Sequence, residues 1–121
     1  MRLLIFAFAA LSLPYSAALA ADNPAAELAK ADQTLNAAFK QIEHRLSDDA
    51  NGKQRLIKAQ RAWIAFRDAE CTFQSSGDDG GSAAPMIIAS CRTNLTVERT
   101  KQLKAYLNCQ EGDLSCPVPS E

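Results

Sequence analysis

The chain has 121 residues, of which 47% are hydrophobic and 22% are charged, and its formal net charge is -1. Its 13 lysines and arginines do not outnumber its 14 aspartates and glutamates, and no dense basic run occurs. Because a nucleic-acid-binding surface needs concentrated positive charge to neutralise phosphates, this composition argues against that class of function.

The first 20 residues are typical of a secretory signal peptide. Arg2 precedes an apolar run over residues 3–13, and the small residues Ala18 and Ala20 stand at the positions that signal peptidase reads. We expect cleavage after Ala20, or one residue later, which leaves residues 21–121 as a single mature domain. The apolar run spans only about half of a ~30 Å hydrocarbon core, and no cysteine follows it for lipidation. The sequence therefore predicts a periplasmic or secreted protein that is soluble after cleavage.

The first mature segment is predicted to be a helix. Asp22 or Asn23 can cap its start, and Pro24 fits its first turn. Apolar residues then recur at spacings of three and four, which places them on one helix face. They are Leu28, Ala31, Leu35, Phe39, Ile42 and Leu46. The turn-forming run over residues 47–52 is expected to end this helix.

A second helix is predicted from about Lys53 to Phe73, with a broad apolar stripe. It is followed at residues 75–82 by a run with three glycines, which predicts a flexible exposed loop. Ser82 is the expected N-cap of a third helix that reaches about Leu107.

Residues 108–121 form an irregular tail in which Pro117 and Pro119 preclude regular structure. The chain has neither an internal repeat nor strand-like alternation of apolar and polar residues. The predicted fold class is therefore all-α, a small up-down antiparallel three-helix arrangement with a disulfide-closed C-terminal tail.

The chain has four cysteines, and an even number in an exported chain indicates two disulfides, with three connectivities open. A zinc site is disfavoured, because His44 is the only histidine and the cysteine gaps do not fit a C-x2-C knuckle. Antiparallel second and third helices would bring Cys71 and Cys91 to facing turns, within the roughly 7 Å between Cα atoms that a disulfide needs. Cys109 would then pair with Cys116.

Pairing Cys71 with Cys91 also sets the register between the second and third helices, and this register places Trp63 opposite Arg99. We expect the Arg99 guanidinium to lie over the Trp63 indole, a cation–π contact worth about 2 kcal/mol when desolvated. Trp63, Phe66 and Arg99 are accordingly interpreted as a structural seam between helices, with a recognition surface as the alternative.

The segment from Gln60 to Cys71 (QRAWIAFRDAEC) is the most distinctive stretch of the chain. Its pattern, Q-x-x-W-x-x-F-R-D-x-x-C, is followed by a Gly/Ser loop, by Cys91 and by T-x-x-R-x-x-x-L from Thr96 to Leu103. This order resembles the LprI-like lysozyme-inhibitor family over about residues 28–107. The resemblance implies an exported, mostly helical domain, and the named member of that family is a lipoprotein that inhibits lysozyme.

The chain departs from that family in its cysteines. It lacks a lipobox cysteine and the early cysteine usual in the family, and it has Cys109 and Cys116 in its tail instead. The first departure predicts a protein without a lipid anchor.

The candidate partner-binding residues are Asp78 and Asp79, at the tip of the glycine-rich loop, and Arg67 and Asp68 in the second helix. Lysozymes are typically basic, so an acidic loop would assist encounter, and a loop can plug a cleft. In the alternative interpretation the two loop aspartates only solubilise a connection, and Arg67 and Asp68 are polar groups between helices. Because Arg67 and Asp68 are adjacent, they are expected on different helix faces.

The sequence predicts a binding protein rather than an enzyme. It has no serine elbow, no cysteine left free as a nucleophile and no evident acid–base pair of carboxylates, and no cofactor or metal is expected. The first hypothesis is an exported protein that inhibits a lysozyme-type muramidase by occluding its cleft. The alternative is a periplasmic adaptor, immunity or envelope-maintenance protein with a different protein partner.

Overall fold

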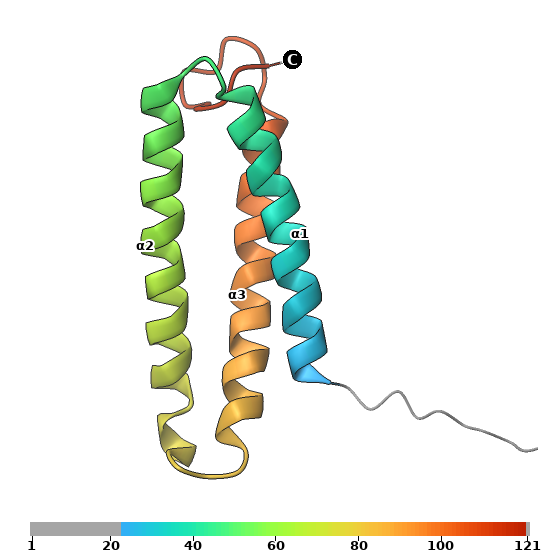
Figure 1. The fold of residues 1–121 in the computed structure, drawn as a ribbon, viewed down its shortest axis with the longest axis vertical. Coiled ribbons are helices and arrows are strands. Elements are labelled where there is room, and N and C mark those ends of the chain that lie inside the picture. The colour runs from blue at the N-terminus through green and yellow to red at the C-terminus, as the bar shows by residue number, and fades with distance from the viewer. Residues whose placement is uncertain (1–22, 121) are drawn as a thin grey trace, which may run out of the picture.

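The computed structural model describes residues 23–120 and consists of three long helices. They are α1 (Pro24–Arg45), α2 (Ala50–Gln74) and α3 (Ala84–Leu107), and the 3-10 turn η1 (Ser76–Asp78) follows α2. The helices run up, down and up, with α3 between α1 and α2, and the tail folds across the end where α1 joins α2 (Figure 1). No strand occurs in this part of the chain. The predicted all-α fold is confirmed.

The predicted signal peptide, residues 1–20, lies outside the described residues. Within residues 23–120, no helix combines the length and the apolar character needed to cross a membrane.

Side-chain caps set where the first two helices begin. The Asn23 side chain accepts hydrogen bonds from the backbone N–H groups of Ala25 and Ala26, as expected of an N-cap followed by proline. Asp49 caps α2 in the same way, accepting from the Gly52 N–H at 2.8 Å. The prediction that this helix begins near Lys53 is therefore wrong by about one turn. Asp49 acts as its N-cap, so the helix already begins at Ala50.

The core lies between α1 and α3, toward the end that carries the tail. Leu35, Ile42 and Leu46 of the apolar face predicted for the first helix are buried there together with residues from α3 and the tail. This cluster consists of Leu35, Ala38, Ile42, Leu46, Leu103 and Val118. From α2, Leu56 and Trp63 pack against it while remaining partly exposed. The stability of the domain thus rests mainly on the contact between α1 and α3.

The tail is closed by a disulfide between Cys109 and Cys116, whose Cα atoms are 5.8 Å apart. This closure turns the chain back so that Val118 is only 4% exposed within the core. Within the loop, the Ser115 hydroxyl and the Ser115 backbone N–H both donate to Asp113, which lowers the pKa of that carboxyl. The tail is therefore part of the packed domain rather than an appendage.

Candidate functional site

The hairpin formed by α2 and α3 is cross-linked just before its loop. Cys71 and Cys91 are both buried and form a disulfide with 5.5 Å between their Cα atoms. The structure therefore has the pairing that the antiparallel arrangement predicted. The link holds the two helices together at the base of the loop over residues 75–83.

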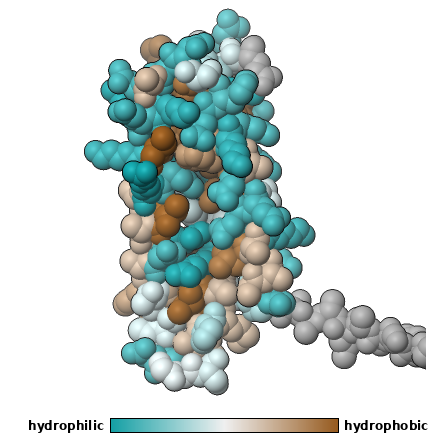
Figure 2. All heavy atoms as spheres, in the orientation of Figure 1, coloured by the Kyte–Doolittle hydropathy of each residue, from teal (hydrophilic) through white to brown (hydrophobic). Residues whose placement is uncertain are grey.

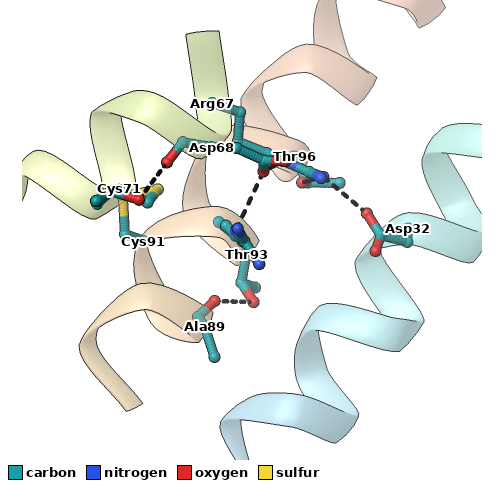
Figure 3. Close-up of polar contacts among 10 residues, drawn as sticks. Asp32, Arg67, Asp68, Cys71, Ala89, Cys91, Thr93 and Thr96 are labelled. Atoms are coloured by element: carbon teal, nitrogen blue, oxygen red, sulfur yellow. Dashed lines mark hydrogen bonds and ion pairs between the residues drawn. A yellow bond between two sulfur atoms is a disulfide. The ribbon is translucent and has the colours of Figure 1, made fainter. Parts of the chain in front are cut away.

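One turn away from this disulfide, Arg67 of α2 joins all three helices (Figure 3). Its Nη1 donates to Asp32 of α1 at 3.0 Å and to Thr96 of α3 at 3.1 Å. Its Nε donates to Asp68 at 3.1 Å, and Asp68 also pairs with Arg92 of α3. With its side chain only 12% exposed, Arg67 is a structural residue at the centre of the bundle.

The side chains of Arg67 and Asp68 are 12% and 41% exposed, a difference expected of adjacent helical residues, but the expectation that only one of them meets a neighbouring helix is wrong. Both side chains turn toward α3, where the carboxylate of Asp68 lies between the guanidinium groups of Arg67 and Arg92. The arginine side chain is long enough to bend back to its neighbour, and the cost of its burial is offset by two carboxylates.

The cation over Trp63 is Arg67, not the predicted Arg99. The Arg67 guanidinium carbon lies 5.2 Å from the centroid of the Trp63 ring, from a position one turn further along the same helix. Arg99 instead donates from Nε to Gln60 Oε1 at 3.1 Å and from Nη1 to Gln102 at 3.0 Å. It still connects α3 to α2, but through the buried amide of Gln60.

Placing Phe66 in the seam is also wrong, because its side chain is 56% exposed. The face of α2 that contacts α3 carries Gln60, Arg67 and Cys71. Adjacent helical residues are separated by about 100° around the helix axis, so the residue before Arg67 is turned away from that face. Phe66 therefore points outward from the bundle.

The loop between α2 and α3 is folded on itself rather than being an irregular connection. Asp78 is the centre of this fold: its Oδ2 accepts from the Ala83 N–H at 3.0 Å, and its carbonyl accepts from the Gly81 N–H at 2.8 Å. Gly80 adopts a φ of +72, which only glycine tolerates readily. The N-cap residue of α3 is Ala83, and no side chain caps the helix, so the prediction that Ser82 is its N-cap is wrong.

At the tip of this loop, the side chain of Asp79 is exposed, and none of the described residues donates a hydrogen bond to its carboxylate. Two large apolar side chains flank the loop and are also exposed, Phe73 by 73% and Met86 by 55%. Sequence reasoning missed both, although each stands directly beside the polar loop. Of the four candidate binding residues, Asp79 alone remains free to meet a partner, since Arg67, Asp68 and Asp78 have internal roles.

No group of three or more His, Cys, Asp or Glu side chains among residues 23–120 could hold a metal ion. Recognition of a partner by this site would rest on the carboxylate of Asp79 and on the two apolar side chains.

Comparison with known proteins places the chain in a family. A family model described as lysozyme inhibitor LprI matches residues 17–103, a span that includes the Cys71–Cys91 disulfide and excludes the tail disulfide. An uncharacterized protein of Rhizobium meliloti (strain 1021) is 37% identical over 91 residues. That alignment covers 72% of this chain and 66% of the relative, slightly less than two thirds of its length. A search of the solved structures finds no match. The chain belongs to the lysozyme inhibitor LprI family.

Proposed function

We propose that this protein is an exported inhibitor of a lysozyme-type muramidase and that it acts by inserting the α2–α3 loop into the enzyme's cleft. The observation that carries the proposal is the loop itself. It is cross-linked at its base by Cys71–Cys91, is folded internally around Asp78, and exposes Asp79, while Phe73 and Met86 are exposed on the helices that precede and follow it.

Rigidity supports this proposal. A loop that is already ordered loses little conformational entropy when it binds, which leaves more of the contact energy for affinity. The disulfide and the two hydrogen bonds to Asp78 hold the loop in one shape before any partner arrives. Protein inhibitors that occlude clefts depend on this preorganisation.

The chemistry of the tip also suits such a target. The exposed Asp79 carboxylate would steer the loop toward a basic enzyme and pair with its cations. Phe73 and Met86 supply apolar area on either side, and buried aromatic anchors dominate the energy of many interfaces.

The proposal is tested by lysis of a peptidoglycan suspension. The mature protein, with both disulfides formed, is titrated against several lysozyme types while the loss of turbidity is followed. We expect lysis to slow at near-stoichiometric ratios. Undiminished lysis by every enzyme type at excess protein would contradict the proposal and leave an adaptor, immunity or envelope-maintenance role with another partner.

Variants locate the site within the same assay. Asp79→Ala and Phe73→Ser should each weaken inhibition at least tenfold without changing the melting temperature, because both side chains are exposed. Asp48→Ala is the matched control, since Asp48 is an exposed aspartate in the α1–α2 loop at the opposite end of the molecule. Equal loss of inhibition in the control would show that overall charge, not the loop, is responsible.

A further inference from the structure

The outer face of α2 carries an apolar row that nothing in the described chain covers. Its members are separated by three, four, three and four residues, the spacing of a heptad seam. They are Ala59, Ala62, Phe66, Ala69 and Phe73, and all five are exposed. Pale brown atoms line the lower part of the molecule's outer edge along α2, whereas teal atoms line its upper part (Figure 2).

The other elements leave most of this row unpartnered because α2 contacts the bundle mainly through its opposite face, although Ala59 also borders a cavity shared with α1 and the tail. The opposite face contributes Gln60 and Cys71, the two buried residues of α2. The regular spacing of the outer row over four turns distinguishes it from single exposed apolar side chains, which are common on protein surfaces. A row of this kind fits another helix laid along it.

We infer that a second copy of this chain occupies the row, with the two α2 helices antiparallel. The first support is the alternation of small and large side chains from Ala62 to Phe73. In an antiparallel pair that sets Phe66 opposite Ala69 of the second copy, Phe73 falls opposite Ala62 of the second copy. Each phenyl ring then packs over an alanine, which lets the helices approach closely.

The second support is the distribution of charge along α2. Arg55, Lys58 and Arg61 are exposed in its first half, and no acidic residue occurs between Ala50 and Phe66. Glu70 lies in its second half, and the exposed Asp79 follows in the loop. An antiparallel pair therefore sets each basic half beside the acidic half of the other copy, whereas a parallel pair aligns like charges.

Both supports apply to one symmetric arrangement. A two-fold axis perpendicular to α2 makes every contact occur twice. Both rows are then buried in the same interface, so the association stops at a dimer. The inference shares Phe73 and Asp79 with the proposed inhibition, but Phe66 lies on α2 outside the proposed inhibitory site, so a change at Phe66 tests the dimer separately.

Sedimentation equilibrium of the mature protein, from low micromolar to submillimolar concentration, tests the inference. We expect twice the monomer mass at high concentration, and Phe66→Asp should weaken dimerisation at least tenfold. Because Phe66 is already 56% exposed, this change should leave the helical circular dichroism intact. Leu114→Asp is the matched control, since Leu114 is a fully exposed apolar residue in the tail, and it should leave the dimer unchanged.

Orientation is tested by double electron–electron resonance on a spin label at Ala59→Cys. The antiparallel register separates the two labels by about 25 Å along the helix axis, whereas a parallel pair would place them side by side. A monomer at all concentrations, a dimer that survives Phe66→Asp, or adjacent labels would each overturn the inference. So would a monomer whose complex with lysozyme is lost in Phe66→Asp, because the row would then serve a different partner.

Discussion

Arg67 lies over the ring of Trp63 while donating hydrogen bonds to Asp32 of α1 and Thr96 of α3. A single guanidinium therefore connects the aromatic residue of α2 to both neighbouring helices. It does so one turn from the disulfide that supports the α2–α3 loop. The contacts that tie α2 to its two neighbours therefore lie next to the disulfide at the base of the loop.

Replacing Arg67 by alanine should destabilise the protein by about 2 kcal/mol, because Asp32, Asp68 and Thr96 each lose a hydrogen-bond partner in a partly buried site. Arg67→Lys should recover only part of this loss, because an ammonium group cannot reach the same set of partners in one plane. Urea unfolding of the three proteins measures the difference. Arg61→Ala, at an exposed position of the same helix, should change stability by less than about 0.5 kcal/mol.

Trp63 is the only tryptophan in the chain, so its fluorescence reports which arginine it contacts. Arg67→Ala should shift the emission of the folded protein, because the ring loses the cation over its face. Arg99→Ala should lower stability by about 1 kcal/mol through the loss of its bond to Gln60, with unchanged emission. If Arg99→Ala shifted the emission and Arg67→Ala did not, the arginine that contacts Trp63 would be Arg99 and not Arg67.

The two disulfides should differ in what their removal affects. In the chain-entropy model, Cys71→Ser with Cys91→Ser costs about 3 kcal/mol, and opening the shorter tail loop costs slightly less. Inhibition should fall in the first variant even where it remains folded, because the loop loses its cross-link. The Cys109→Ser and Cys116→Ser pair should lower the melting temperature but retain inhibition in the folded fraction. Equal inhibition by both variants at matched folded fraction would argue against the loop as the site.

The tail residue Val118 should contribute to stability although it lies beyond the last helix. Val118→Ala removes buried methyl groups from the core between α1 and α3, which should cost about 1–2 kcal/mol. The exposed neighbour Ser120→Ala is the control, and thermal unfolding compares the two. A negligible effect of Val118→Ala would mean that the tail does not pack against the helices in solution.

Asp78 and Asp79 should separate into a structural residue and a binding residue. Asp78→Ala removes the acceptor of the Ala83 N–H and should destabilise the protein by about 1 kcal/mol, as the loss of one partly buried hydrogen bond does. Asp79→Ala should leave unfolding unchanged, so any loss of inhibition would belong to recognition. Unfolding and lysis measurements on both variants make the comparison. A loss of stability in Asp79→Ala would show that Asp79, like Asp78, has a structural role.

The sequence alone determined the elements of this fold and how they are linked. The spacing of apolar residues in α1 predicts a single face, and Ala31, Leu35, Ile42 and Leu46 are indeed buried. Both disulfides follow from an antiparallel hairpin and elimination of the remaining pair. These features depend on local periodicity and chain connectivity, which the order of residues specifies directly.

Only the tertiary structure decided how α2 is rotated about its own axis and which long side chains meet. Its apolar residues surround much of the helix, so periodicity does not distinguish a buried Gln60 face from an exposed Phe66 face. The side chains of Arg67 and Arg99 are both long enough to reach several partners. In the folded protein Arg67 contacts Trp63, and Arg99 donates a hydrogen bond to Gln60. Helix rotation and side-chain pairing depend on packing against α1 and α3 together, and no local pattern contains that information.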